Sequence, residues 1–405
     1  MKASRYLLIG VVLGIAIGWA LGYLGLPYFQ HDAAFAIGFA TCVAVTVVIW
    51  LLVSRKVRRR YAWLAGVLGI LAAGAVSGWW IAGKRAALQA DLDRQQQLVQ
   101  QQAALIQAEK NAGQMQVLAD LMGRVQDELQ ERSDGTLSTT TISKIAALSH
   151  ALPPYISAAG ATGEVRARSP ERGQLLLALQ AMKLDTETWD LILRDSRFSG
   201  ADLRGAALSN AYLARADLVG ADFRDADLTG ADLSIADLTE AGMWGARLNG
   251  ADLHRAVLKR AMLAWAELYD ANLDSTKLEE ANMSNARMKR SSIRNATAKW
   301  VDLRGADLQH AVLTNADLTG AKLQRTRLHQ ADCTHANLTL ARLRETDLSE
   351  TVLQQVAVFE ADWIEKLEQW QVVGAAAISQ TYRLVEDPSA PANLRLVAQE
   401  EDGIR

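Results

Sequence analysis

Proline and cysteine are scarce in this chain, which has 6 prolines and 2 cysteines among 405 residues. No proline occurs between Pro170 and Pro388, as expected where backbone N–H groups pair with neighbouring strands. Cys42 lies in an apolar stretch and Cys333 lies far along the chain in a repeated region, so the geometry excludes a disulfide between them. We expect Cys333 to be a small core residue.

The most regular feature of the sequence is a five-residue repeat that runs from Phe198 to Val358. A large apolar residue returns at every fifth position, and it is leucine at 24 of the 33 central positions. The residue two places earlier is alanine in 25 of the 33 blocks. A period of five matches neither the alternation of a strand nor the helical period of about 3.6, so the repeat predicts a solenoid.

Blocks such as Ala201–Gly205 and Ala306–His310 follow the pattern A-(D/N)-L-x-x and resemble the pentapeptide-repeat family. The resemblance implies an all-β solenoid, a right-handed quadrilateral β-helix with one block per side and four blocks per coil. Residues 145–150 and 169–177 also resemble a linker of bacterial members that carry N-terminal membrane helices. That subgroup has no assigned reaction, so the resemblance implies an architecture and no catalysis.

In such a solenoid the central residue and the small residue two places before it point inward, while the other three residues of a block face water. Residues 20 apart stack at about 4.8 Å, so the repeat makes about eight coils. The predicted core ladder includes Leu203, Phe223, Leu268, Leu278, Leu318 and Cys333. Glycines at the fifth position are expected at corners of the chain, not in a phosphate-binding loop.

Helical segments are predicted to cover the solenoid ends, which would otherwise expose core and strand edges. Residues 134–195 form a helical linker and N-terminal cap, in which Ser169 before Pro170 opens one helix and a second follows around 186–193. The β-helix occupies residues 196–360. Residues 361–405 form a C-terminal helical cap and tail, and the part beyond Pro388 is expected to be loose.

Residues 1–83 are predicted to be a membrane anchor of three transmembrane helices. The apolar stretches 6–26, 33–53 and 61–83 contain no charged residue, and each approaches the ~20 residues that span a bilayer. Basic residues gather in the loop between the second and third stretches, at Arg55, Lys56, Arg58, Arg59 and Arg60. The positive-inside rule therefore predicts a bacterial inner-membrane protein with a periplasmic repeat domain.

Residues 84–133 are predicted to form a polar, glutamine-rich helical stalk. Its apolar residues follow an irregular heptad spacing, which leaves two alternatives. The 84–132 helix self-associates into a small homo-oligomer, or it packs back on its own chain. The run from Ser133 to Thr136 ends the stalk, and a short helix over 142–151 stops before Pro153.

Chemistry-bearing groups are few in the repeated region, and we expect no enzyme activity, cofactor or metal. His310 and His329 should lie one coil apart on the same side, but their neighbours Asp307 and Gln330 do not complete a metal site. No acid/base pair or nucleophile constellation stands out. The chain between Arg197 and Trp363 has 23 acidic and 20 basic residues, too few net charges to imitate DNA, so nucleic-acid binding and topoisomerase inhibition are disfavoured.

The sequence therefore favours a membrane-tethered scaffold whose rod binds a protein or an envelope component. An accessory subunit of a membrane transport or envelope-stress system is the alternative, although the apolar stretches lack an intramembrane charge for transport. Trp and Arg are enriched at binding hot spots. The candidate interaction patch comprises Trp244, Trp265, Arg204, Arg224 and Arg304, unless the 84–160 segment folds back over the two tryptophans.

Overall fold

The computed structural model describes residues 84–86, 88–99, 101–102, 110, 112–132, 134–155, 167–387 and 394–399. The chain divides into two units, residues 1–108 and 109–405. The described residues of the first unit are helical. The three predicted spans and the basic loop at 55–60 lie outside the described residues. Within the described residues, no helix combines the length and apolarity needed to cross a bilayer.

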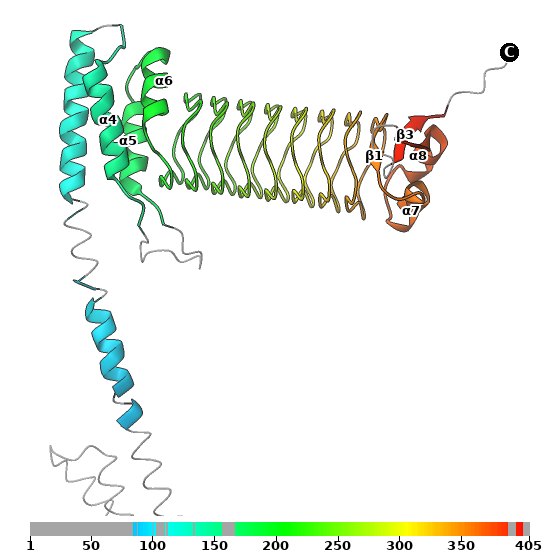
Figure 1. Ribbon diagram of the computed structural model, residues 1–405, viewed down its shortest axis with the longest axis horizontal. Coiled ribbons are helices and arrows are strands. Elements are labelled where there is room, and N and C mark those ends of the chain that lie inside the picture. The colour runs from blue at the N-terminus through cyan, green and yellow to red at the C-terminus, as the bar shows by residue number, and fades with distance from the viewer. Residues whose placement is uncertain are drawn as a thin grey trace, which may run out of the picture. The chain divides into compact units, whose positions relative to one another are not determined.

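The second unit starts with four helices, and Figure 1 shows the labelled ones at the start of the repeat rod. Residues 112–131 form the first, followed by α4 (Thr139–Ala151), α5 (Pro170–Gln180) and α6 (Thr186–Asp195). Each labelled helix begins after a side-chain cap: Ser138, Ser169 and Asp185 accept hydrogen bonds from backbone N–H groups three residues later. These caps satisfy donors that the first helical turn leaves unpaired, and the helix predicted from Ser169 and Pro170 is confirmed.

The predicted stalk is not one free element. Leu118, Leu121 and Val125 are buried in the same apolar cluster as residues of α4 and α5. Residues 112–131 therefore pack on their own chain, which was one of the two alternatives. The described residues from 84 to 131 are helical, but residues 84–102 fall in the other unit, and the extent of a stalk over 84–133 stays a prediction. Self-association through the 84–132 helix stays a prediction.

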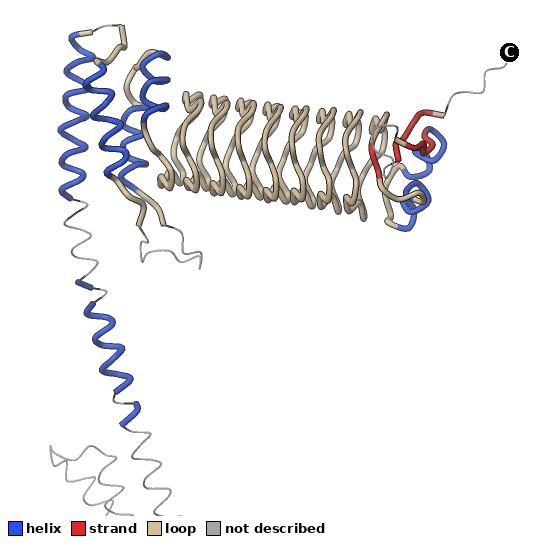
Figure 2. Tube along the Cα trace, viewed as in Figure 1, coloured by secondary structure: helices blue, strands red, loops and turns tan. Residues whose placement is uncertain are grey.

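The solenoid is built from single parallel bridges between residues 20 positions apart, such as Asp202 with Asp222 and Glu267 with Arg287. Four blocks therefore complete one coil, as the pentapeptide pattern implies. Figure 2 draws these coils as loops because each side is too short for a regular strand. At the corners the fifth residue of nearly every block adopts a left-handed backbone, and glycine fills only some of these positions.

The core ladder is confirmed as a buried column. Leu203, Phe223, Leu268, Leu278, Leu318 and Cys333 are each at most 2% exposed. The alanines two places before the central residues are buried as well, with one exception at Ala341. Burial raises the pKa of the Cys333 thiol to about 12, so this cysteine stays protonated and acts as a small core residue.

The N-terminal cap closes the first coil through the start of α5. Ser169 forms a parallel bridge with Ala201, and a side chain at Gly173 would collide with the backbone of Asp202. Arg172 is 3% exposed and donates hydrogen bonds to the carbonyls of Ser149 and Ser199. The helical cap therefore completes both the core and the strand edge that the first coil would expose.

The C-terminal cap contains more than the predicted helices. It comprises β1 (Ala357–Val358), α7 (Trp363–Gln369), α8 (Ala375–Thr381), β2 (Tyr382–Glu386) and β3 (Leu394–Ala398). The three strands form an antiparallel sheet in the order β1-β3-β2. The expectation that the chain beyond Pro388 is loose is wrong for residues 394–399, because Leu396 is fully buried and β3 pairs on both edges.

Candidate interaction surface

The rod has four sides, and residues 20 apart share a side. We refer to these sides by their central residues in one coil, as the Leu203, Leu208, Leu213 and Leu218 sides. Trp244, Trp265 and the three arginines of the predicted patch all belong to the Leu203 side, since they follow central residues of that series. The repeat thus places the five predicted residues on one face of the rod.

The two tryptophans are exposed on this side. Trp244 is 48% exposed and Trp265 is 57% exposed. Ala264 is the residue 20 positions after Trp244, and it precedes Trp265 in the next coil. Ala264 is buried. Within the described residues of the second unit both rings are open to solvent, so residues 112–155 do not cover the tryptophans.

The arginines of the predicted patch are occupied by ion pairs. Arg204 lies 2.7 Å from Asp202, Arg224 lies 2.9 Å from Asp222, and Arg304 lies 2.7 Å from Asp302. Each carboxylate precedes its arginine by two residues and stands on the same side of the rod. Such paired groups neutralise one another on the surface.

These pairs set the charge state of the carboxylates. Burial alone would raise the pKa of Asp202, but hydrogen bonds and positive charge from Arg204 outweigh it and lower the pKa. Burial also opposes ionisation of Asp302, and there Arg304 and Lys322 lower the pKa below its usual value. Both carboxylates therefore stay ionised at neutral pH and hold their arginines in place.

Only some residues of the predicted patch lie near one another along the rod. Arg224 is one coil before Trp244, whereas Arg204 is two coils before it and Arg304 is three coils after it. At about 4.8 Å per coil, the outer arginines lie roughly 10 to 15 Å from Trp244 along the rod. The structure brings together the two tryptophans with Arg224 at the edge, and it does not gather the three arginines around them.

Two exposed apolar features were missed by the sequence interpretation. Trp300 is 53% exposed on the Leu218 side, and its ring lies against Gly320 of the next coil.

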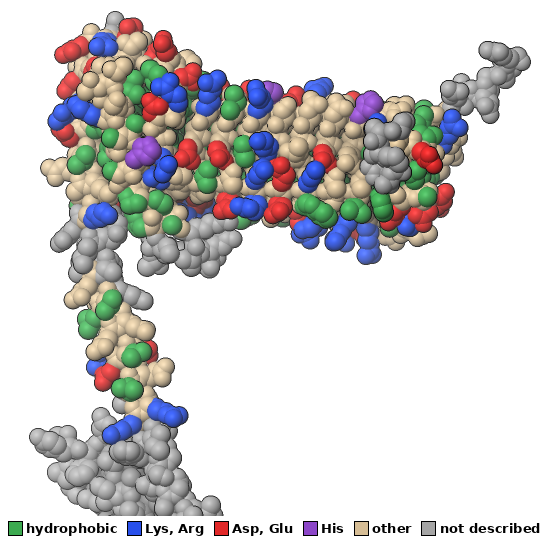
Figure 3. Space-filling model, viewed as in Figure 1, with side chains coloured by type: hydrophobic (Ala, Val, Ile, Leu, Met, Phe, Trp, Pro, Cys, Tyr) green, Lys and Arg blue, Asp and Glu red, His purple; other side chains and the backbone are tan. Residues whose placement is uncertain are grey.

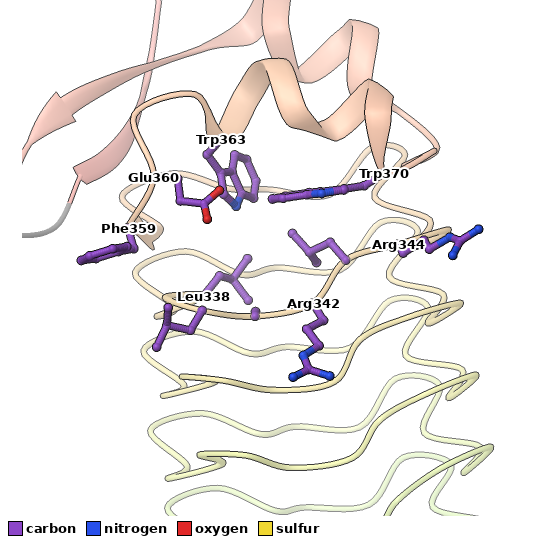
Figure 4. Close-up of a pocket in the computed structure, with 10 residues that line it drawn as sticks. Leu338, Arg342, Arg344, Phe359, Glu360, Trp363 and Trp370 are labelled. Atoms are coloured by element: carbon purple, nitrogen blue, oxygen red, sulfur yellow. The ribbon is translucent and has the colours of Figure 1, made fainter.

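A pocket of about 290 Å³ also opens between the last coil and α7, as Figure 4 shows. The sequence feature that could have indicated this pocket is Leu340. It is an apolar residue at the fifth position of a block, where polar residues and glycine predominate.

No metal centre emerges from the described residues, in which no group of three or more His, Cys, Asp or Glu side chains converges. The rings of His310 and His329 are 6.1 Å apart and meet edge to face, which confirms that they lie one coil apart on one side. A ring nitrogen of His329 is 2.9 Å from the hydroxyl of Ser349. This pair is a contact between neighbouring coils.

Charges of both signs are interspersed over the face of the rod that Figure 3 shows. Charged residues also form ion pairs between coils, as in Arg290 with Asp270 at 2.6 Å and Arg325 with Glu345 at 2.6 Å. Both pairs join residues 20 positions apart, so they tie one coil to the next. The face in view therefore carries no continuous stripe of one charge.

The sequence profile described as pentapeptide repeats matches this chain in 8 copies, over residues 196–234, 236–274, 266–305, 299–332 and 327–362. The matched residues are the ones that form the coils. Residues 196–362 belong to the pentapeptide repeat family. No curated protein matches it.

Several solved pentapeptide repeat proteins resemble the solenoid. HetL, involved in heterocyst differentiation regulation in the cyanobacterium Nostoc, is 29% identical, over 38% of this chain and 88% of its own, with a TM-score of 0.19. A protein of the Arabidopsis thaliana thylakoid lumen is 25% identical, over 31% of this chain and 71% of its own, with a TM-score of 0.18. The plasmid-mediated fluoroquinolone resistance protein QnrB1 is 19% identical, over 44% of this chain and 91% of its own, with a TM-score of 0.25.

Proposed function

We propose that this pentapeptide repeat protein is a non-enzymatic, membrane-tethered scaffold whose rod binds a protein or another envelope component. The observation that carries the proposal is the exposure of Trp244 and Trp265 on one side of the rod. Large aromatic side chains contribute strongly to binding when a partner removes them from water. A coil stack needs no aromatic residue at an outward position, since its core is already complete.

The membrane tether is proposed from the three uncharged apolar stretches in residues 1–83. The basic loop from Arg55 to Arg60 orients them with that loop in the cytoplasm. On this proposal the protein lies in a bacterial inner membrane and its rod stands in the periplasm. The rod would then meet soluble periplasmic proteins or envelope polymers.

A topoisomerase inhibitor that imitates DNA is not favoured. Imitation of a duplex needs closely spaced negative charges along the whole rod. Here the carboxylates of the Leu203 side, such as Asp202, Asp222 and Asp302, are each paired with an arginine. The likeness to QnrB1 is at 19% identity and concerns the fold.

The test of the scaffold function is partner capture with the variant Trp244→Ala, Trp265→Ala. We expect this double variant to keep its melting temperature and to lose the proteins that co-purify with the wild-type chain. Trp300→Ala is the matched control, because Trp300 is equally exposed on a different side. A loss of several degrees in the melting temperature of the double variant would identify the tryptophans as an internal contact and refute the site.

A further inference from the structure

The C-terminal cap leaves one side of the last coil without a partner strand. On the Leu203 side the parallel bridges continue from Asp202 as far as Arg342 and stop there within the described residues. On the Leu208 side Asp347 bridges to Val373 of the cap, and on the Leu218 side β1 pairs with β3. On the Leu213 side the N–H of Leu353 donates to the Tyr382 hydroxyl at 3.1 Å.

Two main-chain groups beside Arg342 point to the missing strand. Earlier in the rod each coil forms two main-chain hydrogen bonds of this kind to the next coil. For example, the Asp222 N–H donates to the carbonyl of Ala201, and the Asp222 carbonyl accepts from the N–H of Leu203. The corresponding groups of the last coil are the Ala341 carbonyl and the Leu343 N–H, and neither has a hydrogen bond to any described residue. An unpaired edge of this kind accepts an added extended strand.

The pocket of about 290 Å³ opens directly at this edge. Figure 4 shows Trp363 and Trp370 of the cap above it and the last coils below it. Ala341 is partly exposed, whereas the residue at the equivalent inward position of every other block from 196 to 356 is buried. Solvent therefore reaches the apolar core of the rod at this one place among the described blocks. The walls are formed mainly by Leu338, Leu340, Leu343, Phe359, Trp363 and Trp370.

The rim of the pocket is positively charged. Arg342 is exposed, and no described acidic side chain lies within ion-pair distance of it. The Arg344 side chain is 71% exposed and meets only Glu345, at 3.3 Å. The acidic residue of the rim, Glu360, is already paired with Lys366 at 2.6 Å. A ligand with carboxylates opposite the two arginines is thus complementary in charge.

We propose that this edge binds an extended segment of a partner protein with the order small, acidic, large apolar, acidic. The first acidic residue lies parallel to Arg342, donates its N–H to the Ala341 carbonyl and accepts from the Leu343 N–H. The small residue before it stacks on Ala341, and the large apolar residue after it enters the pocket beneath Trp363. The side chain of the second acidic residue meets Arg344. The Glu345 N–H already donates to the Trp370 carbonyl at 2.8 Å, so the segment follows the path of one more solenoid block only as far as its large apolar residue.

The site is separate from Trp244 and Trp265 and does not depend on a membrane tether. Its probe is the fluorescein-labelled peptide Ser-Ala-Asp-Leu-Asp-Ser, titrated with the detergent-purified full chain and followed by fluorescence anisotropy. A second peptide carries an N-methyl group on the first Asp, which removes the donor to Ala341. We expect saturable binding of the first peptide and binding at least about fivefold weaker for the second, which corresponds to the loss of one hydrogen bond.

Two variants test the protein side of the contact. Leu340→Asp adds a negative charge to the pocket wall, and Arg342→Glu reverses the charge at the edge. Leu340 is 54% exposed with a φ of 59°, and Ile235 is 43% exposed with a φ of 63° at the same block position on the Leu213 side. Ile235→Asp is therefore the matched control for Leu340→Asp.

We expect Leu340→Asp and Arg342→Glu each to weaken peptide binding at least about fivefold. Ile235→Asp and the Trp244→Ala, Trp265→Ala double variant should bind like the wild type. The proposal is overturned by an absence of saturable binding, by equal affinity for the N-methyl peptide, or by affinity that neither pocket variant changes. Loss of binding in the double tryptophan variant would move the peptide to that patch and overturn the assignment to the edge.

Discussion

At the scale of single residues, the inward and outward positions of a block have opposite tolerance to charge. Leu268 is fully buried in the middle of the stack, and Glu267 beside it is partly exposed and lies 3.1 Å from Arg287. A carboxylate at the inward position would lie among leucines with no partner. A missing carboxylate at the outward position removes one solvent-screened ion pair.

We therefore expect Leu268→Asp to lower the free energy of unfolding by several kcal/mol. Glu267→Ala should lower it by about 1 kcal/mol or less. Thermal unfolding followed by circular dichroism measures both. Equal damage from the two substitutions would contradict the assigned inward and outward positions.

The pair of Asp302 with Arg304 predicts an acid-dependent contribution to stability. The folded protein lowers the pKa of Asp302 below its ordinary value of 3.8. A lowered pKa in the folded state contributes stability that is present above pH 3.8 and lost as the pH falls through the lower, folded pKa. The difference in unfolding free energy between the wild type and Asp302→Asn should accordingly shrink as the pH falls below that value.

Denaturant unfolding at a series of acidic pH values measures this difference. The same comparison in an Arg304→Gln background is the control, because it removes the main partner that lowers the pKa. There the effect of Asp302→Asn should depend less on pH. An unchanged pH dependence would show that Arg304 does not set the ionisation of Asp302.

At the scale of elements, the repeat was predictable because its signal is local. Leucine at each centre and alanine two places before it report the inward positions directly, and a shift by one residue would bring Asp202 or Glu267 into the core. The cap of α5 was predictable for the same reason, since Ser169 and Pro170 are adjacent in the sequence.

The C-terminal cap was less predictable because its partners are distant in the chain. Strand β3 is held by pairing with two strands. One is β1, about 37 residues earlier in the chain, and the other is β2, which precedes β3 across a connection that contains proline. The five-residue strands β2 and β3 carry no long alternation that would distinguish them from a tail. The open edge at Arg342 likewise depends on where α7 leaves the rod, which no local pattern encodes.

The link between the last coil and α8 depends on Gly374. Its φ is +93°, and an added Cβ would lie 3.0 Å from the backbone N and Cα of Ser349. Gly374→Ala should therefore strain the backbone and push the cap away from the Leu208 side, with a loss of more than about 1 kcal/mol of stability. Hydrogen exchange should accelerate at the Leu348 N–H, which donates to the Val373 carbonyl at 2.9 Å.

Gly250→Ala provides the control for that substitution. Gly250 also has a positive φ, of +65°, but nothing lies within 4 Å of an added Cβ. Its alanine variant carries the backbone strain alone and should leave exchange at Leu348 unchanged. The same acceleration in both variants would mean that the close approach to Ser349 does not hold the cap.

At the scale of the whole molecule, the proposed function needs both the repeat rod, which would bind the partner, and the apolar stretches of residues 1–83, which would hold the protein in a membrane. The repeat offers side chains at fixed spacings along one rod, and residues 1–83 offer apolar stretches without charge. If the stretches span a membrane, the side of that membrane on which the rod stands decides which partners reach Trp244, Trp265 and the edge at Arg342. The orientation of the anchor is thus the property on which the choice of partner rests.

The orientation is tested by fusing a reporter enzyme that is active only in the periplasm. We expect activity when the reporter follows Arg132 and none when it follows Val57, because the basic cluster around Val57 should stay in the cytoplasm. Replacing Arg55, Lys56, Arg58, Arg59 and Arg60 together with Gln should give a mixture of orientations and reduce activity of the fusion after Arg132. Activity after Val57 and silence after Arg132 would place the rod in the cytoplasm, and its partners would then have to be sought among cytoplasmic proteins.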